Sequence, residues 1–131
     1  MVDETTDTSN LEQATTIVRW VSDSLEISED FIGLYQVPAI DADTLTAAIK
    51  DVLLRMNLSL NRICGQCYDG ASSMSGAKSG VAKRIKVDEQ RALYTHCYGH
   101  SLNLAASDAI KASKLMSNAL DTSYEIVKLI K

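Results

Sequence analysis

The sequence has little of what marks unfolded, secreted or membrane-spanning chains. Of 131 residues, one is proline and six are glycine, and no run approaches the roughly 18 to 20 apolar residues of a membrane span. Three cysteines cannot all pair internally, so reduced thiols in the cytosol or nucleus are the simplest interpretation. The first residues are acidic, unlike a secretory signal. With 46% apolar and 23% charged residues, the chain is expected to form one compact domain.

The formal charge of −4 conceals an uneven distribution along the chain. Residues 1–51 carry eleven acids and two bases, whereas residues 52–131 carry eleven bases and six acids. Lys78, Lys83 and Arg84 belong to a basic stretch that is able to contact phosphate groups. A run of this kind is more commonly a solvated helix face, so the charge alone leaves both interpretations open.

The first half of the chain predicts a hairpin followed by a helix. Residues 15–21 and 31–37 are rich in β-branched and aromatic side chains and are separated by a polar turn region, as in an antiparallel hairpin. After Pro38, apolar residues recur with helical spacing from Leu45 to Met56. Asp41 or Asp43 is available to cap the first turn of this helix.

The second half predicts alternating strands and helices. The expected strands are 62–68 and 93–97, and the expected helices are 77–86, 102–110 and 116–130. This order of elements predicts an α/β fold with a mixed sheet flanked by helices. The first strand is expected to be truncated, because only Met1 and Val2 precede the polar turn that Asp3 opens.

Two acidic residues lie where strands are expected to end. Asp3 follows the stub of the first strand, and Asp69 follows the strand 62–68 and precedes a small-residue loop. If the two strands are neighbours, both carboxylates point to one end of the sheet, where they could hold divalent cations for phosphoryl transfer. Asp before Gly is also a common turn pair, so spacing alone favours the simpler structural explanation.

Thiol and imidazole groups form a second candidate site. Cys64 and Cys67 have the spacing of zinc ligands, as do Cys97 and His100, with His96 alongside. A strand would direct Cys64 and Cys67 to opposite faces, which argues against a shared zinc ion. A Cys97 nucleophile with His100 as its base is a weaker alternative, because no orienting third group is evident.

Three strings in this sequence, in their order and approximate spacing, resemble motifs of hAT-superfamily transposases. They are residues 3–7 (DETTD), 65–76 (GQCYDGASSMSG) and 96–104 (HCYGHSLNL). The resemblance is nearest to the branch that includes zinc finger MYM-type protein 1 and the repressor of the inhibitor of the protein kinase. It extends over essentially the whole chain, residues 1–131, which corresponds to the N-terminal half of a ribonuclease H-like catalytic core.

The resemblance implies roles for particular residues. Asp3 and Asp69 would be the first two catalytic acids and would bind Mg²⁺ or Mn²⁺. Cys97 and His100 would support the active-site region and would not bind zinc. The third acid of the family, a glutamate beyond a large helical insertion, has no counterpart here, and Glu125 is not assigned that role.

These implications lead to one main functional expectation and two alternatives. The chain is expected to be a fragment of a nuclear hAT-type transposase, either active or domesticated. The complete protein would cleave and transfer DNA strands and form homo-oligomers through a C-terminal segment, with Lys78, Lys83 and Arg84 contacting phosphates. With two of three acids, the fragment alone is expected to be inactive. The alternatives are a transposon-derived nuclear interaction module without catalysis and a small zinc-stabilised domain.

Overall fold

A computed structural model describes residues 1–6 and 11–130 of the chain. The chain divides into two compact units, Met1–Cys97 and Tyr98–Lys131, which are described separately below. Within the described residues, no helix combines the length and the apolar composition that crossing a bilayer requires.

The first unit begins with three antiparallel strands, β1 (Val2–Thr6), β2 (Glu12–Val21) and β3 (Ile27–Gln36), in the order β1-β2-β3. The expected hairpin is therefore confirmed, and its strands are longer than the β-branched runs suggest. A bulge interrupts the β2–β3 register between Thr16 and Ile17. It coincides with Gly33, whose φ of +156° is a backbone conformation that residues with a side chain rarely adopt.

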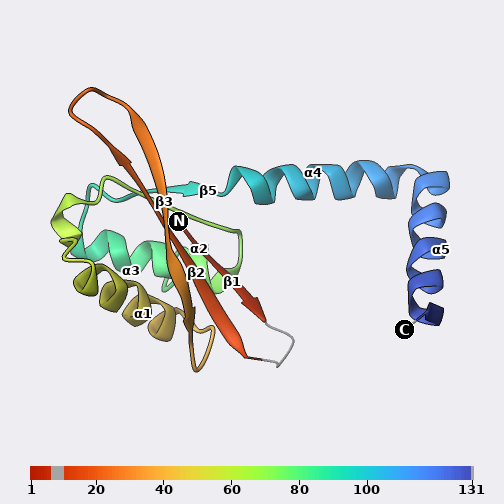
Figure 1. The fold of residues 1–131 in the computed structure, drawn as a ribbon, viewed down its shortest axis with the longest axis horizontal. Coiled ribbons are helices and arrows are strands. Elements are labelled where there is room, and N and C mark those ends of the chain that lie inside the picture. The colour runs from red at the N-terminus through yellow and green to blue at the C-terminus, as the bar shows by residue number, and fades with distance from the viewer. Residues whose placement is uncertain (7–10, 131) are drawn as a thin grey trace. The chain divides into compact units, whose positions relative to one another are not determined.

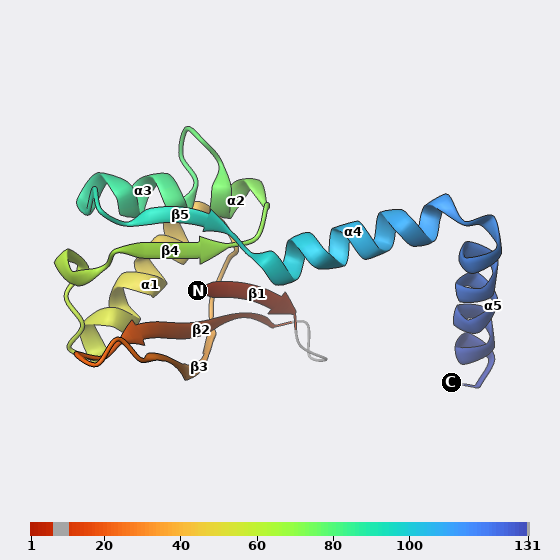
Figure 2. The same cartoon turned by 90° about the horizontal axis from the view of Figure 1, so that it is seen from above.

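Two parallel strands follow, β4 (Gly65–Tyr68) and β5 (Leu93–His96). Figure 2 shows β4 lying next to β1, with β1, β4 and β5 running in the same direction. Among the described residues the hydrogen-bonded ladders form a three-stranded and a two-stranded sheet, which lie side by side. A mixed set of parallel and antiparallel strands results, as the sequence predicts.

Helix α1 (Ala42–Arg55) begins and ends with standard capping arrangements. The Asp41 carboxylate accepts hydrogen bonds from the backbone N–H groups of Asp43 and Thr44, both at 3.0 Å, which confirms the predicted N-cap. At the other end, Leu58 N–H donates to the Leu53 carbonyl at 2.8 Å, and Asn57 has a φ of +53°. This is a Schellman ending, for which asparagine is an acceptable substitute for glycine.

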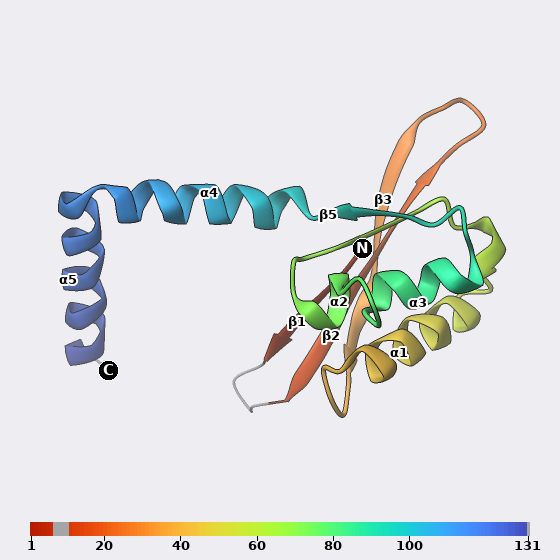
Figure 3. The same ribbon diagram turned by 180° about the vertical axis from the view of Figure 1, so that it is seen from behind.

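Shorter helices complete the first unit. They are the 3₁₀ turn η1 (Leu60–Arg62), α2 (Ser72–Ser75) and α3 (Val81–Asp88). The helices α1, α2 and α3 lie on one face of the strands, as the views from opposite sides show (Figures 1 and 3). The opposite face of the strands is not covered by any described element of this unit.

The hydrophobic core fills the space between the strands and the helices on the covered face. Its fully buried side chains include Leu45 of α1, Met74 of α2, and Val81 and Ile85 of α3. The strands contribute alternate residues, among them Val2, Ala14 and Tyr68. Two ion pairs, Arg84 with Asp43 and Lys50 with Asp88, link α3 to α1 at the surface of this layer.

Three boundaries differ from the expectations. The first strand is not a stub that ends before Asp3: β1 spans Val2–Thr6, so Asp3 lies within the strand. The strand expected at 62–68 is shorter, because Arg62 belongs to η1 and β4 begins only at Gly65. The helix expected at 77–86 begins at Val81, because residues 77–79 form a turn that brings Gly80 so close to Gly76 that an added Cβ at Gly80 would lie 2.5 Å from the Gly76 nitrogen.

The second unit consists of α4 (Tyr98–Ala112) and α5 (Lys114–Ile130). Both expected helices are confirmed, and α4 begins four residues earlier than its apolar stripe indicates. Neither helix contains a buried residue, and apolar side chains such as Leu115 and Leu129 are more than 80% exposed. On α5, Glu125 pairs with Lys128 at 3.7 Å.

Substituting a core leucine and a surface leucine of the same helix tests the packing of α1. Leu45 is fully buried, whereas Leu54 is 78% exposed. We expect Leu45→Ala to lower the free energy of unfolding by about 3 kcal/mol, because it removes buried methyl groups and leaves a cavity. Leu54→Ala is the matched control and is expected to change it by less than about 0.5 kcal/mol. Urea denaturation measures both, and equal effects would contradict the packing described here.

The Glu89 carboxylate predicts a pH dependence of stability. The Arg91 guanidinium and backbone N–H donate to it at 2.9 Å, and these hydrogen bonds lower the pKa of Glu89 from 4.5 to about 2. Its stabilising contribution is therefore complete above pH 4.5 and is lost as the pH falls towards 2.

We expect Glu89→Gln to flatten the dependence of the urea midpoint on pH across this range, since glutamine does not titrate. Glu125→Gln, in the second unit, is the control and should keep the parental pH profile. A Glu89→Gln profile parallel to the parental one would show that this carboxylate is not the titrating group.

Candidate active site

Alternation along β4 determines which side chains reach the uncovered face of the strands. Gln66 and Tyr68 are buried on the helix side, so Cys67 points the other way. The Gln66 amide nitrogen donates to the carbonyl oxygens of Ala82 and Ala92, both at 2.9 Å. These bonds fix which face of β4 points to the helices. Turning the strand over would leave the Gln66 amide and the carbonyls of Ala82 and Ala92 without hydrogen-bond partners.

The same alternation on β1 exposes Asp3 on the uncovered face, since Val2 is buried towards the helices. The Met1 amino group donates a hydrogen bond to the Ile17 carbonyl at 2.7 Å, which aligns the start of the chain with β2. Burial lowers the pKa of this amino group, and the Cys67 thiol is among the groups close enough to affect it. The beginning of β1 therefore lies within electrostatic range of Cys67.

The neighbouring strands bring Asp3 and Asp69 to the same part of the molecule. β1 and β4 lie next to each other and run in the same direction (Figure 2). Asp3 is the second residue of β1, and Asp69 directly follows the last residue of β4. Alternation places Asp3 on the uncovered face, the face to which Cys67 points.

The turn after β4 holds Asp69 through three contacts. The Asp69 Oδ1 atom accepts the backbone N–H of Ala71 at 3.0 Å, and the Tyr94 hydroxyl donates to the Asp69 carbonyl at 3.1 Å. A side chain at Gly70 would begin 3.2 Å from His96 Nε2, so glycine lets the turn approach the histidine ring closely. Tyr94 also stacks on Tyr68, with 6.2 Å between ring centroids.

Two carboxylates on an accessible surface are suitable ligands for a hard divalent cation such as Mg²⁺ or Mn²⁺. Asp3 is exposed and Asp69 is half-buried, so both could accept a hydrated ion. Among the described residues, no three histidine, cysteine, aspartate or glutamate side chains are arranged to hold a metal. The pair therefore fits a partial metal site that needs a further ligand.

The zinc alternative gains no support from the described residues, which contain no group of three histidine, cysteine, aspartate or glutamate side chains able to hold a metal. Cys64 is exposed beside the Arg62 carbonyl, whereas Cys67 is half-buried. Burial raises the pKa of the Cys67 thiol, which favours the protonated form over a zinc-binding thiolate.

Cys97 and His100 belong to different units of the chain. Cys97 is the last residue of the first unit, and its N–H donates to the Tyr68 carbonyl at 2.8 Å. His100 lies in the first turn of α4, in the second unit. The supporting role implied for this pair, and the alternative of a Cys97 nucleophile, both stay predictions.

The three predicted phosphate contacts lie on or beside the helical layer. Lys78 is exposed in the loop before α3, and Lys83 is exposed on α3 itself. The Arg84 guanidinium is already engaged, because it pairs with Asp43 and donates to the Ser79 carbonyl at 2.7 Å. Since α3 lies on the covered side of the strands, Lys83 and Arg84 do not share the face of Asp3.

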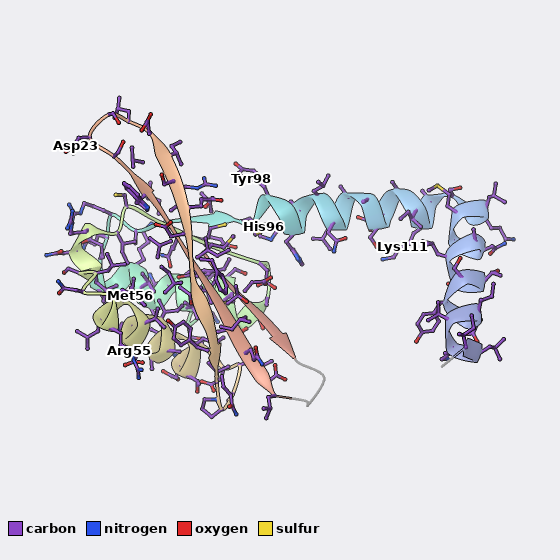
Figure 4. All side chains as sticks on the ribbon, in the orientation of Figure 1. Asp23, Arg55, Met56, His96, Tyr98 and Lys111 are labelled. Carbon is purple, nitrogen blue, oxygen red and sulfur yellow. The ribbon has the colours of Figure 1, made fainter. Side chains whose placement is uncertain are left out.

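Tyr94 is a site residue that the sequence alone did not single out, and His96 was named there only beside the zinc candidates (Figure 4 labels His96 at the end of β5). They pair in register with Gln66 and Tyr68, so they face the covered side beneath the Asp69 turn. The alternation of exposed and half-buried residues along β5 contains this information. This alternation identifies Tyr94 and His96 only when the pairing of β4 with β5 is known, and the sequence alone does not reveal that pairing.

Removing the Tyr94 hydroxyl tests how the Asp69 turn is held. Tyr94→Phe keeps the ring stacked on Tyr68 and loses only the hydrogen bond to the Asp69 carbonyl. We expect a loss of about 1 kcal/mol in the free energy of unfolding. Amide exchange at Gly70 and Ala71 should accelerate more than exchange within α1, and a uniform change across the unit would contradict a local role.

Two comparisons relate this chain to known proteins. Residues 1–80 match the model of a protein family described as DUF4371: ZMYM1/FAM200, RNase-like domain. Among curated proteins, the chain is similar to proteins from Homo sapiens and Mus musculus, each named 52 kDa repressor of the inhibitor of the protein kinase. Identity is 28% over 127 residues in both, which covers 96% of this chain and 16% of each relative.

The chain thus spans about a sixth of the length of these curated relatives. The matches confirm the resemblance to the branch of ZMYM-type and repressor proteins, and the RNase-like description agrees with the mixed α/β fold. They do not test the hAT assignment.

Proposed function

The chain belongs to the transposon-derived family of ZMYM1/FAM200 RNase-like domains, and from this premise we propose that it is the front half of a hAT-type, ribonuclease H-like core. In the complete protein, this core would direct a divalent cation to a DNA phosphate for strand cleavage and transfer. The chain by itself is expected to be inactive.

The observation that carries this proposal is that each of two neighbouring strands provides an accessible acid. Asp3 lies in β1 and Asp69 directly follows β4, and these two strands run in the same direction (Figure 2). A structural turn residue at position 69 would have no reason to be matched by a second exposed acid on the adjacent strand.

Asp3 and Asp69 would hold a Mg²⁺ or Mn²⁺ ion, which when bound supplies Lewis acidity at a phosphate oxygen. The protein's own contribution is to orient the carboxylates. The Ala71 N–H bond to Asp69 Oδ1 leaves the second carboxylate oxygen of Asp69 available to a ligand. A third carboxylate from another part of the complete protein would complete the site.

DNA, the nucleus and self-association belong to the same proposal. Lys78 and Lys83 are exposed and would contact phosphates, whereas Arg84 would do so only if its pair with Asp43 opened. Nuclear localisation is supported by the relatives, which are named as repressors. Homo-oligomerisation through a C-terminal segment would concern the complete protein.

Titrating the chain with Mn²⁺ tests the metal site directly. We expect the paramagnetic ion to broaden the amide signals nearest Asp3 and Asp69 first, because both carboxylates contribute to binding. Asp69→Asn should weaken this broadening about tenfold or more, since it removes one of two charged ligands. Asp51→Asn, an exposed acid on α1, is the matched control and should leave it unchanged. Broadening centred elsewhere would contradict the site.

Nicking of supercoiled plasmid by the complete protein tests the catalytic role. We expect activity that requires Mg²⁺ or Mn²⁺ and falls at least about a hundredfold in Asp3→Asn and in Asp69→Asn. The Asp51→Asn variant should keep the parental rate. Activity that survives both substitutions would show that these acids do not hold the catalytic ion.

A second candidate function is a nuclear interaction module that keeps the fold without catalysis. The observation that favours it is the printed name of the relatives, which describes repression and not strand transfer. A complete protein that binds Mn²⁺ at Asp69 but does not nick DNA under any tested condition would favour this candidate.

A further inference from the structure

Strand β3 has an unpaired outer edge. It is ten residues long and pairs with β2 on one side, and no other strand in the described part of the chain lies against its other side. Folded proteins usually protect such an edge with lysine or proline, and β3 contains neither. Its protective devices are the charged side chains of Glu29 and Asp30 and the bulge at Gly33, and the stretch from Ile27 to Phe31 is regular.

The ladder identifies the backbone groups that this edge presents. Ser22 N–H donates to the Glu26 carbonyl at 2.9 Å, so Glu26 bonds towards β2. Alternate residues of an antiparallel ladder bond to the same neighbour. Residues 28 and 30 therefore also bond towards β2, and Ile27, Glu29 and Phe31 direct their N–H and C=O groups outward.

The edge is accessible because the hairpin extends beyond the helical layer. Figure 1 shows β2 and β3 continuing past α1 and α3, and Figure 4 labels Asp23 at the tip. Ile27 is 68% exposed and Phe31 63% exposed, on the same side of the strand as Glu29. An added strand would thus gain backbone hydrogen bonds and apolar contacts together.

The negative charge of the β2–β3 hairpin favours a positively charged partner. Residues 12–36 contain five acids and one base, Arg19, which pairs with Glu29. Asp30 accepts a hydrogen bond from Trp20 Nε1 at 2.7 Å on the opposite face. A partner strand with lysine or arginine would be attracted to this edge, whereas a second copy of β3 would bring further acids and no base.

We propose that the edge of β3 from Ile27 to Phe31 binds an extended, lysine- or arginine-bearing segment of a partner protein as an added strand. The backbone groups of Ile27, Glu29 and Phe31 form the ladder, the exposed apolar side chains contact alternate residues of the segment, and the hairpin acids select a basic one. This surface is separate from Asp3 and Asp69, and it does not depend on catalysis.

A ten-residue synthetic peptide of alternating lysine with threonine or valine is the probe. Added to the isotope-labelled chain, it should shift the amide signals of Ile27, Glu29 and Phe31 and slow their exchange with solvent. Raising the salt concentration should weaken the binding, since charge contributes to it. The same peptide with glutamate in place of lysine should bind at least about tenfold more weakly.

Two substitutions at one position separate the backbone from the charge. Glu29→Pro removes an outward N–H group without breaking a bond to β2, and should weaken peptide binding by about tenfold. Glu29→Gln keeps that N–H and removes the charge together with its ion pair to Arg19, so a smaller loss of roughly twofold to threefold is expected. Thermal unfolding verifies that each variant is folded.

Glu29→Lys provides a test that survives if the proline variant does not fold. This substitution replaces a negative charge with a positive one, so the affinity for the glutamate peptide should rise relative to the affinity for the lysine peptide. Peptide-induced shifts that avoid residues 27–31 would overturn the proposal. Sedimentation that shows a dimer whose Glu29 amide is protected without peptide would also overturn it, in favour of a second copy as the occupant.

Discussion

The facing of β4 is the constraint on which the rest of the first unit depends. Gln66 sits in the core with its amide nitrogen bonded to carbonyls of α3 and of the segment before β5. A buried amide with both donors engaged permits only one orientation of the strand. With that orientation given, Tyr68 joins the core, Cys67 turns to the uncovered face, and Asp69 leaves the strand at the end where β1 passes.

The two faces of the strands consequently differ in what covers them and in the side chains they carry. The covered face is a packed core whose helices are linked by the Arg84–Asp43 pair, so the basic residues of α3 are partly committed to structure. The uncovered face carries acids, thiols and apolar side chains without a covering element in this unit. The outer edge of β3 extends this open surface, and its acidity makes a basic protein segment a better occupant than nucleic acid.

Prediction from sequence succeeded where the signal was local. The spacing of apolar residues located α1, and the aspartate before it was recognised as its cap. It failed at β1, because an acid inside a strand resembles the start of a turn until its partner is known: Asp3 is held in the strand by its pairing with Thr15. For zinc, alternation along the expected strand already separates Cys64 from Cys67, and the described residues contain no group of three side chains that could hold a metal.

The sequence by itself determined the types of most elements and identified the two acids as candidates. It also made reduced thiols the simplest interpretation of the three cysteines. These follow from periodicity and composition, which act over a few residues. Only the tertiary structure decided that β1 lies beside β4, that Tyr94 and His96 support the Asp69 turn, and that β3 forms an edge. Such facts depend on which strands pair, and pairing between distant segments is selected by the packing of the whole core.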